Sequence, residues 1–312
     1  MKRLKSMSLA VLGSGWSGSG AMVELLKGQS GASGYPFELD FWRKPKGLRN
    51  IKNQREMLIF FGNEIFSTIK IISKTIVKLI FQPMSIKVHL KVILLQVKMF
   101  FLMLLFFISS IFSSKVKFKK KSFIKMFKFF FGKKGSVFIY DQAVFLEQID
   151  DPVLGDLEVD AFIIVLRDVF DQAQDLLNNA SFLNVNTIRE SFFLGAEGDL
   201  GSNQNSIQLN LILLTLRYRV RRIIELVEKY PDSFLILKFE NLIEDTKKVV
   251  SNVNRFLELK GFPPSFIDYN NAENFLLNSK KNIGIGKQTQ WKYHSLMEEI
   301  NNDINFLIEK NK

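Results

Sequence analysis

Short apolar runs alternate along the chain with longer segments in which apolar residues recur at helical spacing. The nearly continuous apolar runs are residues 7–12, 137–140, 161–166 and 234–239. The segments with helical periodicity are residues 21–26, 168–177, 205–230 and 245–259. Strands that are apolar throughout are typical of a parallel sheet covered on both faces. The pattern therefore predicts an α/β fold with a parallel β-sheet flanked by helices.

Residues 65–134 depart from this pattern. They contain 15 lysines, no arginine, aspartate or glutamate, and 13 of the 31 phenylalanines. Their charge is thus +15 in a chain whose net charge is +12, which leaves −3 for the remainder. Lys70, Lys74 and Lys78 are four residues apart with apolar residues between them, which predicts basic amphipathic helices. We therefore expect one α/β domain, residues 1–50 with 137–312, interrupted by a helical insertion at residues 51–136.

The insertion has the composition of a membrane-binding segment. Residues 99–112 are almost entirely apolar, and extending them back to Val92 gives 21 residues that include Gln96 and Lys98, near the ~20 that cross a bilayer. An odd number of crossings is excluded if both flanks build one sheet. Two alternatives remain. Residues 65–134 form an interfacial helix pair or a re-entrant hairpin at an anionic membrane, with their lysines at the headgroups, or they cap the protein body. Nucleic acid is disfavoured as a partner because the segment has no arginine.

Composition excludes several kinds of site. The chain has no cysteine and only two histidines, His89 and His294. Disulfides, thiolate metal sites and cysteine nucleophiles are absent, and a histidine-rich metal centre is disfavoured. The apolar stretch near the N-terminus stops at Gly13, too early for a signal peptide. We expect a cytoplasmic protein, with the insertion as a means of peripheral attachment to the inner face of a membrane.

Four glycines and three serines follow the first apolar run, between Gly13 and Gly20. A glycine-rich loop between a strand and a helix directs backbone N–H groups at a phosphate-like anion. The loop lacks the lysine of a Walker A motif, since Gly18 is followed by Ser19. Gly13, Gly15 and Gly18 also match G-x-G-x-x-G, with Glu38 placed 20 residues further on. A dinucleotide site and a plain turn therefore remain alternatives.

The segment Trp16-Ser-Gly-Ser-Gly20 resembles the 5′-phosphosulfate loop of PAPS-dependent sulfotransferases, (K/R)-S-G-(T/S)-(T/S/G). Three further segments resemble that family in the correct order. Residues 160–171 are similar to its strand-to-helix element ending in R-D-P-x-D, residues 230–245 to its YP…E-D-L…D element, and residues 279–287 to its basic closing loop. The resemblance covers residues 7–50 and 137–292. It implies a P-loop NTPase-like fold, PAPS as sulfuryl donor without a metal, and a glycan or glycolipid hydroxyl as acceptor.

The same resemblance assigns nucleotide binding to Gly15, Trp16, Ser17, Gly18, Ser19, Gly20, Arg167, Asp175, Lys281 and Lys287. Arg167 corresponds to the ligand of the 3′-phosphate. Two positions depart from the family. Trp16 replaces a lysine or arginine that offsets charge on the leaving oxygen, and an indole offers only an N–H donor. Asp175 replaces a serine ligand of the 3′-phosphate, and a carboxylate there repels phosphate.

Catalytic candidates lie between the glycine loop and the insertion. The segment Phe37-Glu-Leu-Asp-Phe-Trp42 resembles the K-E-x-x-F-F element of glycan sulfotransferases, in which the glutamate is the base. The resemblance implies Glu38 as base, with Asp40 as second candidate. The cation missing from the loop would be supplied by Arg43, Lys44 or Lys287. The alternative is a pair of carboxylates on a solvent-facing edge strand.

Other polar residues carry weaker expectations. Asp141 and Gln142 could line an acceptor pocket, although a helix N-cap is an equal alternative for Asp141. Glu240 is expected to be structural. The arginines at 217, 219, 221 and 222 are expected to form a solvated helix face.

Two other classes of function compete with a sulfotransferase. Trp16 and Asp175 favour a nucleotide-binding, non-catalytic protein at a membrane. The glycine loop by itself also fits a kinase-like or dinucleotide-binding enzyme.

Overall fold

The computed structural model describes two compact units. The described residues are 7–14, 17–35, 47–81, 86–112, 116–133, 136–142, 149, 158–179, 209–269, 283–287 and 289–311. One unit comprises residues 1–39 and 133–312, and the other comprises residues 40–132.

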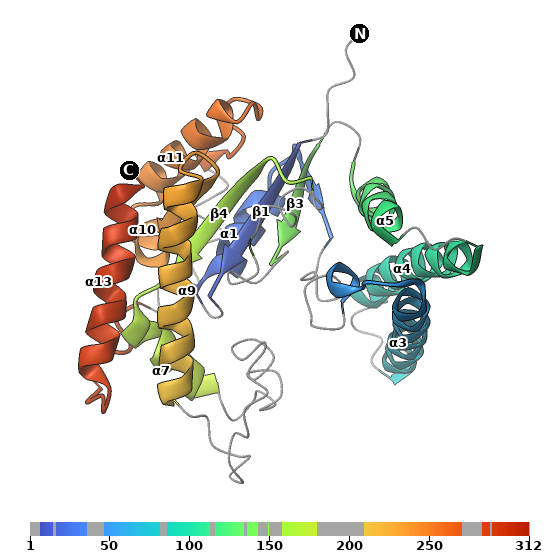
Figure 1. The fold of residues 1–312 in the computed structure, drawn as a ribbon, viewed down its shortest axis with the longest axis horizontal. Helices are drawn as coiled ribbons and strands as arrows, with labels where there is room; N and C mark the ends of the chain where they lie inside the picture. The colour runs from blue at the N-terminus through green and yellow to red at the C-terminus, as the bar shows by residue number, and fades with distance from the viewer. Residues whose placement is uncertain are drawn as a thin grey trace. The chain divides into compact units, whose positions relative to one another are not determined.

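The first unit is built on a five-stranded sheet. Its strands are β1 (Ser8–Gly13), β2 (Ala32–Gly34), β3 (Val137–Asp141), β4 (Ala161–Leu166) and β5 (Phe234–Lys238). Their order is β2-β3-β1-β4-β5, and all four pairings are parallel (Figure 1). This confirms the predicted α/β fold. Strand β2 precedes the insertion and β3 follows it, yet Ala32 pairs with Val137, so both ends of the insertion connect to neighbouring strands of one sheet.

Helices cover the sheet on both faces. They are α1 (Ser19–Lys27), α7 (Val169–Asn179), α9 (Leu209–Lys229), α10 (Phe239–Glu244), α11 (Thr246–Leu259) and α13 (His294–Lys310). Alternate strand residues such as Leu9, Val11 and Ile163 share one apolar cluster with residues of α1, α10 and α11. On the opposite face α13 packs against α7, α9 and β5 (Figure 1). Burial on both faces explains why the strands are apolar throughout.

Aspartate caps determine where two helices begin. The Oδ1 atom of Asp168 accepts hydrogen bonds from the backbone N–H groups of Phe170, at 2.9 Å, and Asp171, at 3.2 Å. Asp245 caps α11 by accepting from the N–H of Lys248 at 3.2 Å. A side-chain acceptor at the N-cap satisfies donors that have no partner within the helix. These helices therefore start one residue after the aspartates.

The second unit consists of a short 3₁₀ turn and three helices, η1 (Leu48–Asn50), α3 (Gln54–Phe81), α4 (Ile86–Phe112) and α5 (Val116–Phe131). Helices α3 and α4 are antiparallel. Gln54, the first residue of α3, donates from its side-chain amide to the carbonyl of Ser110, near the end of α4, at 2.7 Å. Three buried phenylalanine rings pack between the helices. The ring centroids of Phe106 and Phe123 are 5.1 Å apart, and those of Phe61 and Phe123 are 5.7 Å apart. The predicted helical character of the insertion is confirmed.

Candidate anion-binding site

The glycine loop and Arg167 emerge from neighbouring strands at the same edge of the sheet. Gly13 at the end of β1 pairs with Val165 near the end of β4, so the residues that follow both strands lie close together. After β1 the chain passes to β2 on one side, and after β4 it passes to β5 on the other. Such a switch point, beyond the carboxyl ends of parallel strands, is where ligands bind in this type of sheet.

Gly18 holds the loop in a conformation that other residues rarely adopt. It precedes α1 with φ +85°, and a Cβ atom placed on it would overlap the ring of Phe239. A Cβ on Gly13 would overlap the Oγ of Ser17. Helix α1 has no side-chain cap and no acidic residue in its first turn. Its N-terminal N–H groups and positive dipole end are therefore available to an anion.

The two loop serines differ in their partners. The Ser17 hydroxyl is fully buried and has no hydrogen-bond partner among the described residues. Ser19 accepts a hydrogen bond of 2.6 Å from the amide nitrogen of Gln142, whose Oε1 accepts from the N–H of Gly13 at 3.4 Å. A buried hydroxyl without a partner is costly. Ser17 thus marks a position that an anion oxygen would satisfy.

Gln142 is a site residue whose role the sequence does not identify. The sequence suggests an acceptor pocket for it, whereas its side chain bridges Gly13 and Ser19 at the base of the loop. Its φ of +47° turns the chain at the end of β3, which a strand pattern does not reveal. Its position directly after the last strand residue is the only available signal.

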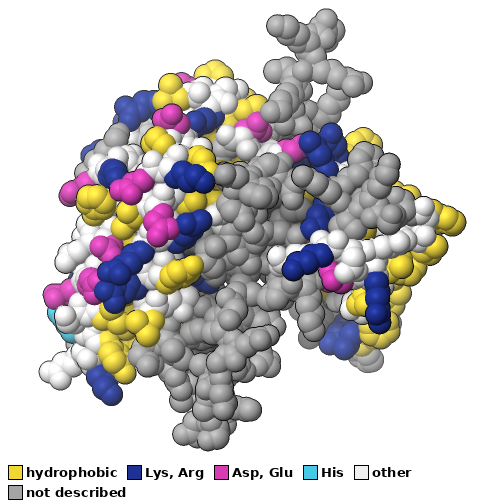
Figure 2. Space-filling view, viewed as in Figure 1, with side chains coloured by type: hydrophobic (Ala, Val, Ile, Leu, Met, Phe, Trp, Pro, Cys, Tyr) yellow, Lys and Arg dark blue, Asp and Glu magenta, His cyan; other side chains and the backbone are white. Residues whose placement is uncertain are grey.

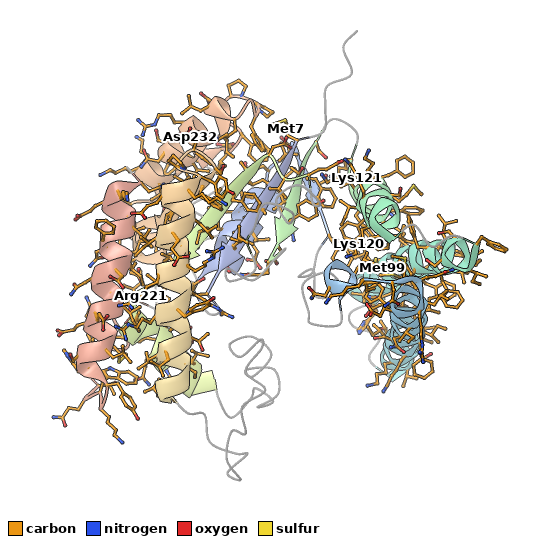
Figure 3. The ribbon with its side chains drawn as sticks, viewed as in Figure 1. Met7, Met99, Lys120, Lys121, Arg221 and Asp232 are labelled. Atoms are coloured by element: carbon orange, nitrogen blue, oxygen red, sulfur yellow. The ribbon has the colours of Figure 1, made fainter. Side chains whose placement is uncertain are left out.

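The burial of Arg219 contradicts the expectation that the arginines of α9 form a solvated helix face. Arg219 is 1% exposed, and its Nη1 donates to the carbonyl of Ser14 at 3.3 Å. Ser14 has a second partner, because the side-chain amide of Gln172 donates to its hydroxyl at 3.1 Å. The expectation is wrong for Arg219 because its position on α9 faces the sheet edge, where the loop offers an acceptor. Arg221, two residues on, is 53% exposed on the same helix (Figure 3).

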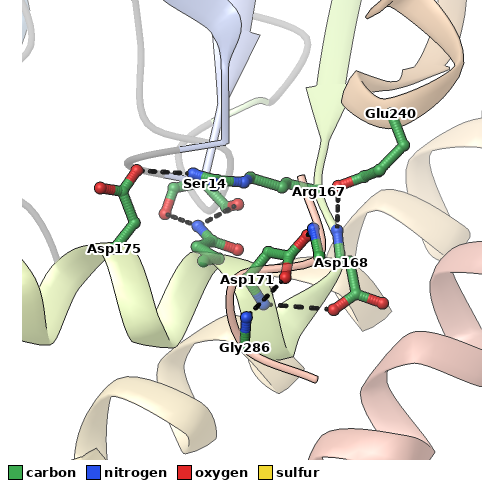
Figure 4. A network of polar contacts seen from close by, with 9 residues as sticks. Ser14, Arg167, Asp168, Asp171, Asp175, Glu240 and Gly286 are labelled. Atoms are coloured by element: carbon green, nitrogen blue, oxygen red, sulfur yellow. Dashed lines mark hydrogen bonds and ion pairs between the residues drawn. The ribbon is translucent and has the colours of Figure 1, made fainter. Parts of the chain in front are cut away.

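Arg167 lies beside the loop and is 2% exposed. Its Nη1 contacts the Oδ2 of Asp175 at 2.7 Å (Figure 4). Its Cζ is 5.3 Å from the ring centroid of Phe239, the same ring that Gly18 approaches. Phe239 therefore connects the guanidinium to the loop. Asp175, expected to contact or repel phosphate, is in this structure the ion-pair partner of Arg167.

The basic loop near residue 285 is attached to the start of α7. The buried carboxylate of Asp171 accepts hydrogen bonds from the N–H groups of Gly284, at 2.6 Å, and Gly286, at 2.9 Å (Figure 4). Trp291 donates to the carbonyl of Gly286 at 2.9 Å. These bonds bring the loop to the turn that follows Arg167, with the side chain of Lys287 exposed to solvent.

Seven of the predicted site residues lie outside the described residues: Gly15, Trp16, Glu38, Asp40, Arg43, Lys44 and Lys281. The chain leading to Glu38 is anchored up to Tyr35, whose carbonyl accepts a 2.6 Å hydrogen bond from the Lys27 ammonium. Burial lowers the pKa of Lys27. Gly20 is described and lies exposed in the first turn of α1.

Glu240 supports the turn that carries Arg167. Its Oε1 accepts from the N–H of Asp168 at 3.1 Å, and its Oε2 is buried without a hydrogen-bond partner among the described residues. Burial, which penalises the ionised carboxyl, raises the pKa of Glu240 from 4.5. This contact with the backbone of Asp168 agrees with the structural role that is expected for Glu240.

The raised pKa of Glu240 predicts a pH-dependent stability. The folded state holds the proton more tightly than the unfolded state, so its stability falls as pH rises from 4.5 through the raised pKa. We expect the free energy of unfolding of Glu240→Gln, measured by urea titration, to lack this decline. Relative to wild type, the variant should gain stability on going from pH 4 to pH 8. An equal pH dependence of the two proteins would contradict this assignment.

The fold is that of sulfotransferase domains. The structure superimposes on the sulfotransferase domain from the curacin biosynthetic pathway with a TM-score of 0.51 and 13% identity, covering 97% of this chain and 99% of that one. It also matches the sulfotransferase domain from the Synechococcus PCC 7002 olefin synthase, with a TM-score of 0.45 and 14% identity over 99% and 95% of the two chains. The sequence matches no protein-family model and no curated protein.

Proposed function

We propose that the protein is a sulfotransferase that uses PAPS and transfers its sulfuryl group to a hydroxyl of a glycan or glycolipid. One observation carries the proposal: a buried arginine and a glycine loop with an unsatisfied buried hydroxyl meet at the switch point of the sheet. Two separate anionic groups suit such a pair of sites, and PAPS carries a 5′-phosphosulfate and a 3′-phosphate. The fold shared with sulfotransferase domains supports this choice.

Different residues would hold the two ends of the nucleotide. Backbone N–H groups from Gly15 to Gly20, with the hydroxyls of Ser17 and Ser19, would bind the 5′-phosphosulfate. Because Ser19 already accepts from Gln142, its own proton is directed to another acceptor. Arg167 would bind the 3′-phosphate, for which its planar guanidinium is suited. Lys281 and Lys287 would cover the nucleotide from the loop that Asp171 holds.

Glu38 is proposed as the base that takes the proton of the acceptor hydroxyl, with Asp40 as the second candidate. Glu38 follows the end of β2 by four residues, so the covalent chain keeps it within about 14 Å of that strand end. Trp16 cannot supply positive charge near the leaving oxygen, and Arg43 is proposed to do so. When bound, PAPS supplies the sulfuryl group. The residues named here bind it, orient it and remove the acceptor proton.

The first test is a calorimetric titration with PAP (3′-phosphoadenosine 5′-phosphate), ADP and NAD. We expect PAP to bind more tightly than ADP or NAD, because only PAP places a phosphate on the 3′ oxygen. Equal affinities for all three would reject the sulfotransferase proposal. Tighter binding of NAD or of ADP with Mg²⁺ would favour the dinucleotide or kinase alternative. Selective PAP binding without sulfuryl transfer to any hydroxyl acceptor would indicate the non-catalytic alternative that Trp16 suggests.

Asp175 gives a prediction that separates binding from structure. Its carboxylate contacts the guanidinium that would bind the 3′-phosphate, so phosphate must compete with it. We expect Asp175→Asn to tighten PAP binding about tenfold, which corresponds to about 1.4 kcal/mol, while ADP affinity stays the same. If Arg167 has only a structural role, Asp175→Asn will lower the melting temperature and leave PAP affinity unchanged.

A further inference from the structure

The unit of helices α3, α4 and α5 exposes many apolar side chains in addition to those buried in its core. Helix α4 buries one stripe of side chains, which includes Met99, Leu102 and Phe106. A second stripe on its other side is exposed to solvent: Leu90, Leu94, Phe101, Leu105, Ile108 and Phe112, each between 47% and 83% exposed. Successive members are three, four or seven residues apart, so they lie along one face. A helix that is apolar on both sides is not typical of a helix facing water.

The exposed apolar side chains continue on the neighbouring helices. On α3 they include Ile59, Phe66, Ile69 and Val77, and on α5 Phe129 is 78% exposed. Figure 2 shows apolar side chains gathered over this unit. Soluble monomers rarely expose apolar patches of this extent, and such patches mark interaction sites.

The charge of the same segment indicates which partner fits. Residues 65–134 contain 15 lysines and no acidic residue. Six lysines lie in the second half of α3 and the first half of α4, at 70, 74, 78, 87, 91 and 98. Lys70, Lys74 and Lys91 are exposed there, and Lys121 is exposed on α5 (Figure 3). Lysines beside an apolar face are typical of proteins that bind anionic lipid, because the apolar side chains enter the interface and the ammonium groups reach the headgroups.

Topology excludes a simple transmembrane anchor. Among the described residues, one helix segment is long and apolar enough to cross a bilayer, His89–Phe112, with a mean hydropathy of 2.4. However, β2 before the insertion and β3 after it are paired in one sheet, so both ends of the insertion are on the same side of any membrane. A single crossing would separate them. Among the described residues no second helix is apolar enough for a return crossing, which favours an α4 that lies in the membrane surface.

We infer that the α3–α5 unit is a monotopic membrane-binding module, which inserts the outer apolar face of α4 into the interface of an anionic bilayer. This inference is independent of the sulfotransferase proposal, since it rests on the composition of residues 65–134, the exposed faces of α3, α4 and α5, and the pairing of β2 with β3. It would also place the protein where a lipid-linked acceptor is found. The alternatives are that the face is covered by the rest of the chain or by a second copy.

Flotation of the full-length protein with lipid vesicles tests the inference. We expect binding to vesicles containing about 30 mol% phosphatidylglycerol and at least roughly tenfold weaker binding to pure phosphatidylcholine, because the lysines favour anionic headgroups. The triple variant Leu94→Gln, Phe101→Gln, Leu105→Gln should bind more than about tenfold more weakly, since it removes the apolar area that would enter the bilayer. A matched control replaces two leucines and one phenylalanine that are exposed in the other unit: Leu214→Gln, Leu259→Gln and Phe306→Gln. The control should bind like wild type.

A second pair of variants tests the charge. Lys70→Glu, Lys74→Glu and Lys91→Glu together should weaken binding to anionic vesicles by more than about 50-fold, since each lysine near the surface contributes strongly. The control is Lys229→Glu, Lys247→Glu and Lys248→Glu, three exposed lysines of the other unit. Circular dichroism and PAP affinity should be the same in all variants, which separates this test from that of the proposed function.

Three results would overturn the inference. Wild-type protein that remains unbound with anionic vesicles would indicate that the chain covers its own apolar face. Equal losses in the test and control variants would show that binding is not specific to α4. A wild-type dimer that the glutamine variant converts to a monomer, without vesicle binding by either, would assign the face to self-association.

Discussion

Replacing Gly18 by alanine should destabilise the sheet-containing unit and abolish nucleotide binding. Two costs combine at this position. A left-handed φ of +85° costs a residue with a Cβ about 1–2 kcal/mol. The added Cβ would also overlap the ring of Phe239, and overpacking a buried contact typically costs about 1–3 kcal/mol more. Because Phe239 also contacts Arg167, its displacement would disturb both parts of the anion site.

Gly261 provides the matched control for Gly18. It has nearly the same φ, +83°, but among the described residues no atom lies within 4 Å of the point that a Cβ would occupy. Gly261→Ala therefore measures the backbone cost alone. The difference between the free energies of unfolding of the two variants, from denaturant titration, should equal the cost of the Phe239 contact. If Gly18→Ala is no less stable than Gly261→Ala, the tight contact between loop and ring does not exist in solution.

Replacing Arg167 by alanine should weaken PAP binding at least about 30-fold, which corresponds to the ~2 kcal/mol of a hydrogen bond to a charged group. The reason is that Arg167 is held buried at the end of β4, where it would bind the 3′-phosphate. ADP lacks this phosphate, so its affinity should change little. Calorimetric titration of both nucleotides on the same variant measures the difference.

The variant leaves Asp175 without its ion-pair partner, which could destabilise the protein. The double variant Arg167→Ala, Asp175→Asn removes both charges and should still lose PAP affinity. Arg221→Ala, at an exposed position on α9, should retain wild-type affinity. Equal losses for PAP and ADP would show that Arg167 acts on the loop rather than on the 3′-phosphate.

Much of the architecture is predictable because it depends on local patterns. Continuous apolar runs indicate β1, β3, β4 and β5, and periodicity indicates α1, α7, α9 and α11. Helix α13 is not among the predicted segments. Strand β2 escapes this kind of prediction, since it has only three residues, Ala32–Gly34, and no apolar run. Its place in the sheet is determined by pairing with β3 across the insertion, which sequence periodicity does not report.

The polar site is predictable only in part. Glycine spacing locates the loop, and the strand-to-helix junction locates Arg167. The contacts that position them come from distant parts of the chain: Gln142 from the end of β3, Arg219 from α9 and Phe239 from the end of β5. The prediction for Arg219 is wrong because an arginine on an amphipathic helix is usually solvated, and only packing reveals an acceptor beneath it.

The sequence by itself determined the fold class, the glycine-rich loop after the first strand and the basic, phenylalanine-rich insertion, because these depend on residue types within a few positions of one another. Tertiary structure alone decided that Asp175 pairs with Arg167, that Ser17 is buried without a partner among the described residues, and that α4 is apolar on its exposed side as well. Each of these depends on which groups from separate segments meet in space. Hydrogen bonding and burial depend on contacts between segments that are distant in the sequence, and the local pattern of residue types does not specify those contacts.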